Sequence, residues 1–343
     1  MLAVKKPLMA LLLLAACDGN PLAPPPDDGG GGGTSVSTLP GTTNPSARSA
    51  ISRHEAQVTT PGSKDYGNGY AEGFSYNAAN DTFTVDNLAF DGANVYQRGS
   101  AVATLGPSRV YEADIVTRDP DTGAPIDQFS YRALYGVSRS GKTNFAIVRT
   151  GSYIPYGFGG FVFSRNGSVT LPTSGQAHFA GDYAGMRDFS GAGGLQYTTA
   201  DMTMDIDFND FNDPSNSGIS GNGVQGMVFN RRILDINGND ITASVVAAIN
   251  SDLNPDVPLT SLPVLLFKVG PGVMDHNGEL EGELSSSVNS GGQATVFEDG
   301  KYYAVISGNN ANEVGGIIVV EGDAPGADGV TVRETGGFIL YRP

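Results

Sequence analysis

The chain contains little cysteine, tryptophan or histidine. Among its 343 residues there are one cysteine, no tryptophan and three histidines. A single thiol cannot form an intramolecular disulfide, so the fold must be stable without covalent bridges. A chain of this length buries enough surface on folding to achieve that. His54, His178 and His276 are too few and too widely spaced for a usual zinc site.

Basic side chains are also scarce. The chain has 20 lysines and arginines against 36 aspartates and glutamates, which gives a formal net charge of -16. Removal of residues 1–16 would delete Lys5 and Lys6 and no acid, leaving 18 − 36 = −18. Nucleic-acid binding needs a basic stripe that this sequence does not contain, so we expect no nucleic-acid partner. The acidity disfavours adsorption to anionic lipid and favours basic partners.

Long hydrophobic runs are absent. The apolar run at residues 8–16 is far shorter than the about 20 residues of a membrane-spanning helix. Lys5 and Lys6 precede it and Leu-Ala-Ala-Cys17 ends it, an order typical of a secretory signal. This ending resembles a bacterial lipobox, in which the cysteine is lipidated and the chain is cleaved before it. We predict a signal peptide over 1–16 and a lipid on Cys17, with an ordinary signal and an incidental cysteine as the alternative.

Residues 17–60 are predicted to be a lipidated, flexible tether. They include three prolines at 24–26, five glycines at 29–33 and a stretch of threonine, serine and proline. Such a composition buries too little apolar surface to offset the entropy of the chain. A chain of about 30 such residues has a root-mean-square reach of about 30 Å, enough to hold a folded part clear of lipid headgroups.

The remainder is predicted to be all-β. Short β-rich runs alternate with glycine, asparagine, aspartate and proline, and the best helix candidate is residues 240–250. A break at 166–175 contains an Asn-Gly turn signal and a proline. We therefore predict a β-rich domain over 61–165 and an eight-stranded antiparallel soluble β-barrel over 166–343.

The strands expected after the break alternate between apolar and polar residues. Phe179 and Tyr183 share one face of the first strand, and His178 and Asp182 share the other, which is typical of a strand with one buried face. Eight such strands can close into a barrel filled by side chains. A membrane barrel is disfavoured because the predicted outward faces carry polar residues instead of an apolar band. The expected strands are 176–186, 194–208, 218–229, 262–269, 279–288, 294–306, 313–321 and 335–342.

Three segments of the C-terminal half resemble the barrel of the transferrin-binding protein B family of surface lipoproteins. They are residues 177–185, residues 204–208, and residues 308–317, the last similar to the family's Gly-x-x-Ala-x-Glu-x-Gly-Gly segment. The resemblance covers roughly residues 166–343. It implies an eight-stranded barrel with a handle, anchored by lipid and often displayed on the outer face of Gram-negative cells, and residues 61–165 take the place of the β-rich handle domain. Members of the family capture host iron-carrier proteins, host regulators or haem carriers.

No constellation of residues indicates an active site, and we expect neither enzymatic activity, a metal site nor a cofactor. Residues 207–213 and 235–240 resemble the start of calcium loops, but the twelfth positions are Gly218 and Val246 instead of a bidentate carboxylate. Polar turns are the simpler interpretation. Residues 138–142 resemble a nucleophile or phosphate loop without the strand–turn–helix context that such a loop needs.

A stretch rich in glycine and aromatic residues, 153–161, is the candidate binding surface. Tyrosine and phenylalanine are common at recognition hot spots. The candidate ligand-binding residues are Tyr153, Tyr156, Phe158 and Phe161. Packing between the two domains is the competing interpretation of the same residues.

The sequence favours a lipid-anchored binding protein at the cell surface. It would capture a protein or a carrier-bound nutrient, with iron- or haem-related cargo implied by the resemblance. A structural or envelope-associated lipoprotein without a diffusible ligand is the alternative. A TonB-dependent receptor or a surface-export barrel as the partner of this protein would favour the capture function over the structural one. The outer membrane is the expected location, but Asp18 follows the cysteine, as in lipoproteins that some enteric bacteria retain in the inner membrane.

Overall fold

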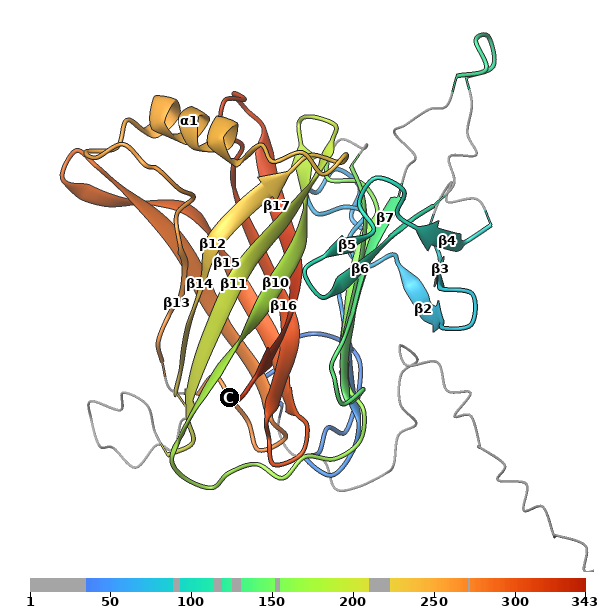
Figure 1. Ribbon diagram of the computed structural model, residues 1–343, viewed down its shortest axis with the longest axis vertical. Helices are drawn as coiled ribbons and strands as arrows, with labels where there is room; N and C mark the ends of the chain where they lie inside the picture. The colour runs from blue at the N-terminus through green and yellow to red at the C-terminus, as the bar shows by residue number, and fades with distance from the viewer. Residues whose placement is uncertain are drawn as a thin grey trace, which may run out of the picture.

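A nine-stranded sheet and a closed eight-stranded barrel lie side by side (Figure 1). The computed structural model describes residues 35–88, 93–113, 119–124, 131–151, 155–209, 223–270 and 272–343. Every strand pair in these residues is antiparallel, and a single helix accompanies the seventeen described strands. The predicted all-β class with an eight-stranded antiparallel barrel is confirmed.

The N-terminal sheet, here called the handle, has the strand order β1-β9-β8-β7-β6-β4-β3-β2, with β5 paired to β6. Its strands are rich in the β-branched and aromatic residues that suit a pleated surface. Every residue of β8 and β9 is buried, because both faces of the sheet are covered there. The bounds are β1 Ile51–His54, β2 Glu72–Asn77, β3 Thr82–Asp86, β4 Val95–Arg98, β5 Thr104–Leu105, β6 Ser108–Glu112, β7 Tyr131–Val137, β8 Thr143–Thr150 and β9 Gly159–Arg165.

The barrel closes from β10 to β17 in chain order. All eight expected strands are present, although residues 218–222 of the third lie outside the described residues. The fourth is only three residues long instead of spanning 262–269, since Pro263 has no N–H for a ladder hydrogen bond. The bounds are β10 Gln176–Ser190, β11 Leu195–Asp207, β12 Gly223–Leu234, β13 Leu265–Phe267, β14 Glu279–Ser290, β15 Gln293–Ser307, β16 Glu313–Asp323 and β17 Thr331–Tyr341.

Side chains fill the barrel interior. Phe179 and Tyr183 are buried in it while His178 and Asp182 are exposed, as the alternation predicts. The helix α1 (Thr242–Leu253) covers one end of the barrel and buries Val246 and Ile249 against a small apolar cluster (Figure 1). It starts two residues later than the expected helix and continues to Leu253, where Asn254 takes the left-handed conformation typical of a helix end.

The tether boundary predicted at residue 60 is wrong. Residues 35–60 lie among the described residues and contact the folded domains, and residues 51–54 form β1 at the edge of the handle beside β9. The low-complexity composition ends near residue 33, and the sequence Ile51-Ser52-Arg53-His54 can extend a sheet edge. Any tether is therefore confined to the residues before 35.

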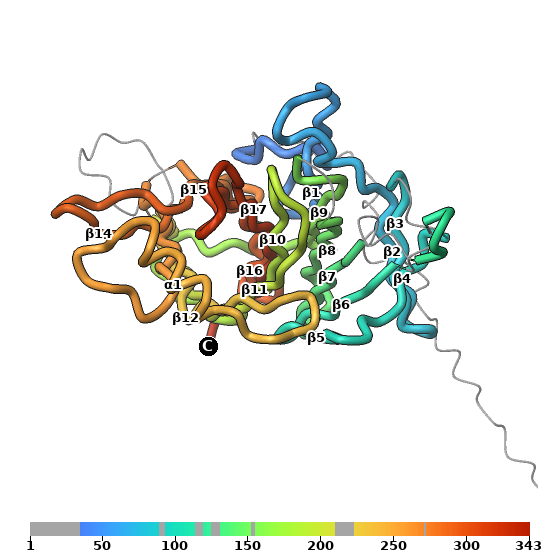
Figure 2. Tube along the Cα trace, turned by 90° about the horizontal axis from the view of Figure 1, so that it is seen from above, coloured from blue at the N-terminus to red at the C-terminus, as the bar shows by residue number. Residues whose placement is uncertain are grey.

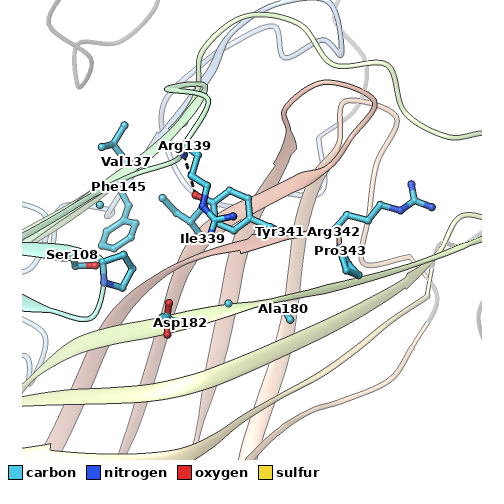
Figure 3. Close-up of a pocket in the computed structure, with 13 residues that line it drawn as sticks. Ser108, Val137, Arg139, Phe145, Ala180, Asp182, Ile339, Tyr341, Arg342 and Pro343 are labelled. Atoms are coloured by element: carbon cyan, nitrogen blue, oxygen red, sulfur yellow. Dashed lines mark hydrogen bonds between the residues drawn. The ribbon is translucent and has the colours of Figure 1, made fainter.

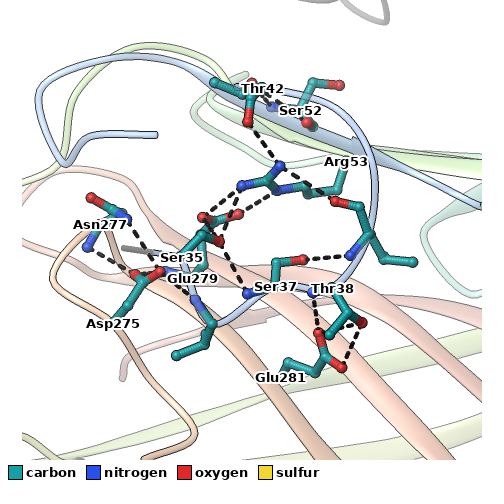
Figure 4. A network of polar contacts seen from close by, with 12 residues as sticks. Ser35, Ser37, Thr38, Thr42, Ser52, Arg53, Asp275, Asn277, Glu279 and Glu281 are labelled. Atoms are coloured by element: carbon teal, nitrogen blue, oxygen red, sulfur yellow. Dashed lines mark hydrogen bonds and ion pairs between the residues drawn. The ribbon is translucent and has the colours of Figure 1, made fainter. Parts of the chain in front are cut away.

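Residues 35–42, here called the strap, bind to the start of β14 (Figure 4). The Ser35 hydroxyl donates to Glu279 at 2.6 Å, and the Thr38 N–H donates to Glu281 at 2.6 Å. The Val36 N–H donates to Asp275 at 3.0 Å. Burial raises the pKa of Asp275, although the backbone N–H groups that it accepts act in the opposite direction. Three carboxylates thus hold the strap against the barrel.

Arg53 locks the strap in place from the handle side. Its Nε donates to Glu279 at 2.6 Å, and both side chains are buried. At the far end of β14, the Ser290 hydroxyl donates to the carbonyl of Leu253 in α1. A strand of twelve residues spans about 40 Å. The strap therefore lies at the end of the barrel opposite α1, and we call these ends basal and apical.

Replacing Glu279 tests the strap. We expect Glu279→Ala to lower the free energy of unfolding by about 3–5 kcal/mol, because Arg53 would remain as a buried, uncompensated charge. Glu283→Ala on the same strand is the matched control: its partner Lys268 and Glu283 itself are exposed, so we expect at most about 1 kcal/mol. Urea unfolding of both variants measures the difference, and equal losses would contradict the assigned role of Glu279.

Candidate functional site

The handle packs against the outer wall of the barrel through an apolar cluster. From the handle come Leu134, Ile147 and Phe163, and from the barrel come Met186 and Ile317, all of them buried. Strand β8 lies against β16 and β17 in this contact. In the view from above, the two bodies meet along β8, β9, β10 and β17 (Figure 2). Removal of this apolar area from water is the main force that joins them.

Glycines allow the two walls to approach closely. The Phe145 ring of β8 lies between Gly136 of β7 and Gly337 of β17, and a Cβ on either glycine would overlap the ring. The preceding residue, Gly336, faces the barrel interior, where a Cβ would overlap the ring of Tyr183. One Gly-Gly pair therefore admits an aromatic ring on each face of β17.

The segment that carries the family resemblance, residues 308–317, docks the handle. Glu313 is buried and accepts hydrogen bonds from the Ser140 hydroxyl at 2.9 Å and the Thr143 hydroxyl at 3.3 Å. A Cβ on Gly315 would overlap the methyl group of Thr143. Residues 138–142, which resemble a phosphate loop in sequence, form the β7–β8 turn that is held here. The sequence shows the motif but not its partner, because that partner lies about 170 residues earlier.

Two buried ion pairs line the interface, one within the handle and one within the barrel, and the arginine of each also hydrogen-bonds across it. The Arg149 guanidinium of β8 donates to Glu55 at 2.8 Å and to the Thr335 hydroxyl of β17 at 3.0 Å. The Arg333 guanidinium of β17 donates to Asp188 at 2.6 Å and also bonds Asn68 of the handle. Buried charges need such complete pairing, because a broken pair leaves an unsolvated charge. Each pair holds its arginine in place, and the hydrogen bonds from Arg149 to Thr335 and from Arg333 to Asn68 join the two walls.

A third set of charges lies inside the barrel near its apical end. Arg231 donates to Glu298 and, at 3.2 Å, to Glu334, which also accepts the Tyr183 hydroxyl at 2.8 Å. Burial alone would raise the pKa of Glu298, but the Arg231 charge and its hydrogen bonds outweigh it and hold that pKa below its usual range. The ionised Glu298 therefore stabilises the folded protein at pH values above the ordinary carboxyl pKa. This contribution is lost as the pH falls through the lowered pKa of Glu298.

The candidate aromatic residues take different positions. Tyr156 is buried under the Arg333 guanidinium, 4.5 Å from its ring centre, and its hydroxyl pairs with Thr331. Phe161 is buried with its ring centre 6.4 Å from that of Tyr303. Both therefore contact the barrel wall.

Phe158 is half-buried beside two tyrosines of the handle. Its ring lies edge-to-face with Tyr70, at 5.3 Å between centres, and with Tyr66, at 6.1 Å. Tyr153 and Cys17 lie outside the described residues. Phe158 is thus the one described candidate that keeps part of its ring accessible to a ligand.

A hollow of about 750 Å³ opens at the apical end of the interface, and we call it the apical hollow. Arg132 and Gly151 border it from the handle. From the barrel, Leu195 borders it at the start of β11, and Ile236 and Ala327 border it from the loops after β12 and β16. Binding sites form preferentially at such junctions between domains, in clefts of about 300–1,000 Å³. Sequence patterns could not reveal this hollow, because five separate chain segments contribute to its lining.

A smaller pocket of about 400 Å³, the basal pocket, lies lower on the same interface (Figure 3). The Arg139 guanidinium lies 4.4 Å from the ring centre of Tyr341, whose hydroxyl accepts the Arg139 backbone N–H at 3.0 Å. Burial raises the pKa of that tyrosine. Phe145 of the handle and Asp182 of the barrel also line it. The pocket thus combines aromatic rings with charges of both signs.

The Asp-rich turns bind their own backbone. The Asp235 carboxylate accepts hydrogen bonds from the N–H groups of Asn237 and Asn239, and hydrogen bonding to Asn239 lowers its pKa. Residues 210–213 of the other turn lie outside the described residues. In the described ranges, no three histidine, cysteine, aspartate or glutamate residues are grouped to hold a metal ion. In the same described ranges, the helix α1 is neither long enough nor apolar enough to cross a membrane.

Comparison with known proteins identifies resemblance only at the level of solved structures. No protein-family model and no curated protein matches the chain. Similar structures include transferrin-binding protein B from Haemophilus parasuis Hp5, with 13% identity and a TM-score of 0.35 over 78% of this chain and 44% of that one. The isotype 1 protein from serogroup B Neisseria meningitidis gives 12% identity and a TM-score of 0.30 over 62% of this chain and 33% of that one.

A structure described as a surface lipoprotein gives 10% identity and a TM-score of 0.27 over 59% of this chain and 78% of that one. The chain spans less than half the length of the transferrin-binding protein B structures reported above. Structures of that family are thus among those that resemble this chain, as the motifs in the C-terminal half predict. Scores this low describe a loose likeness, and the sheet topology given above stands without them.

Replacing Gly337 tests the close approach of the two walls. We expect Gly337→Ala to lower the free energy of unfolding by about 1–3 kcal/mol, because the new methyl group overlaps the Phe145 ring. Gly270→Ala is the control, since a Cβ there meets no atom within 4 Å. Denaturant unfolding of both variants measures the effect, and a Gly337→Ala protein as stable as Gly270→Ala would contradict the packing described here.

Proposed function

We propose that this chain is a lipid-anchored surface binding protein that captures a protein or a carrier-bound nutrient and has no catalytic role. One observation carries the proposal: the strap and the apical hollow lie at opposite ends of the barrel. Residues 17–34 would connect a lipid on Cys17 to the strap at the basal end. The apical hollow would then face away from the membrane, toward a ligand in the medium.

Because side chains fill the barrel, we expect a ligand to bind on its outer surface instead of inside it. Aromatic and aliphatic side chains occupy one part of the interior, and the Arg231 ion pairs occupy the other. Buried carboxylates such as Glu279, Glu298 and Glu334 are engaged by arginines, which favours a structural role for them over acid–base catalysis. A rigid surface loses little conformational entropy on binding, so the fixed interface between handle and barrel suits recognition of a protein.

The apical hollow is our proposed contact with the ligand. It lies within the size range of binding clefts, and its lining combines apolar residues with Arg132. Phe158 belongs to the same handle but to a different part of the surface, so we assign it no more than a supporting contact. The net charge of -16 favours a ligand with a basic face.

The full-length protein, expressed in Gram-negative cells, tests the proposal in two steps. Wild-type protein is expected to incorporate labelled palmitate and to sediment with the outer membrane, and Cys17→Ser is expected to lose both properties. Wild-type cells are then incubated with serum or spent medium, and the bound proteins are identified. Ala327→Arg, which places a large side chain in the apical hollow, is expected to reduce the amount of bound ligand about tenfold.

Ala294→Arg is the matched control, because this alanine is also exposed but lies on β15 away from the hollow. A Cys17→Ser protein that stays palmitoylated on the membrane would refute the anchor. Equal binding by both arginine variants would refute the apical hollow as the site. If no protein from serum or spent medium binds wild-type cells, the envelope-associated structural role takes the place of capture.

A further inference from the structure

An exposed apolar strip lies on β12 and β13. Strand β13 is on the side of the barrel away from the handle (Figure 1). Met227 of β12 and Leu266 of β13 are direct cross-strand partners with exposed fractions of 41% and 55%. Val264 lies two residues before Leu266 and is 38% exposed. Adjacent exposed apolar side chains inside a polar rim mark sites of protein interaction more often than scattered ones do.

Acidic side chains border this strip on the β11 side. Met227 pairs with Thr203, and Asp201 and Asp205 lie two residues to either side of Thr203 on the same face of the strand. Asp201 in turn pairs directly with Asp182 of β10. Asp182 and Asp201 are both exposed, so two carboxylates stand opposite each other on the outer wall, at the point where Asp182 also borders the basal pocket beside the handle.

Like charges in direct cross-strand register destabilise a sheet. In the described residues, neither Asp201 nor Asp205 forms an ion pair with a lysine or an arginine. Asp201 accepts a hydrogen bond from the Asn230 amide at 2.6 Å, and Asp205 accepts one from the His178 ring at 2.7 Å. The arrangement therefore raises the free energy of the isolated protein and offers a favourable site for external positive charge.

We propose that this wall, formed by β10 to β13, is a second docking surface that binds a basic, amphipathic segment of a partner protein. Lysine or arginine side chains of the partner pair with Asp182 and Asp201, and its apolar side chains cover Met227 and Leu266. Four adjacent strands span about 15 Å, which is the width of one helix or one extended segment. This surface is separate from the apical hollow, so it stands whether or not that hollow binds a ligand.

A defined probe tests the surface on the purified, soluble full-length protein carrying Cys17→Ser. The probe is a fluorescent peptide of alternating leucine and lysine, and a second peptide carries serine in place of every leucine. We expect the first peptide to bind more tightly than the second, because only it can cover the apolar strip. Met227→Lys and Leu266→Lys are each expected to weaken its binding about tenfold, and Asp201→Asn is expected to weaken it severalfold.

Val296→Lys is the matched control, since Val296 is 57% exposed but lies at the apical tip of β15. It adds the same charge as the strip variants and is expected to bind like wild type. An equal loss in all lysine variants would show attraction to net charge alone and would overturn the proposal, as would absence of binding to wild type. Thermal melting confirms the fold, and Asp201→Asn, which removes a repulsion, provides a variant that is expected to stay folded.

Discussion

The close contact between the handle and the barrel wall is the constraint on which the rest of the structure depends. It requires glycine at Gly136 and Gly337, so that the Phe145 ring can lie between them. It also accounts for the complete burial of β8, which has the barrel on one face and the aromatic residues of the handle on the other. If this contact opened, Arg149 and Arg333 would face water, and their ion pairs would contribute little to the stability of the protein.

The charges of the chain are divided between the interior and the surface. Several arginines form buried ion pairs with carboxylates, at the interface, at the strap and inside the barrel. Buried pairs of this kind add little net stability but penalise any arrangement that separates them. Arg53 and Glu279 pair across the two bodies, and Arg149 and Arg333 reach across through further hydrogen bonds, so these contacts define the register between handle and barrel. Many other acidic side chains are exposed, and they give the surface its negative charge and the β10–β11 wall its paired aspartates.

The sequence predicts the barrel well because several of its strands bury one face. Alternation along β10 and β11 reveals which residues point inward, whereas most positions of β16 and nearly all of β17 are buried and show no such pattern. Strand β8 shows no alternation, since both of its faces are covered, so its role at the interface is invisible in the sequence. The apical hollow and the glycine contacts join residues far apart in the chain, and the strap was missed because its polar residues bind side chains about 240 residues away.

The central claim is that handle and barrel form one cooperative unit. Hydrogen exchange under increasing denaturant tests this most directly, through the backbone amides of Ile147 in β8 and Ile317 in β16. The structure predicts that both amides exchange through the same opening, with the same free energy and the same dependence on denaturant. Exchange of the β8 amide at a clearly lower free energy, while the β16 amide stays protected, would show that the handle unfolds alone and would contradict the account.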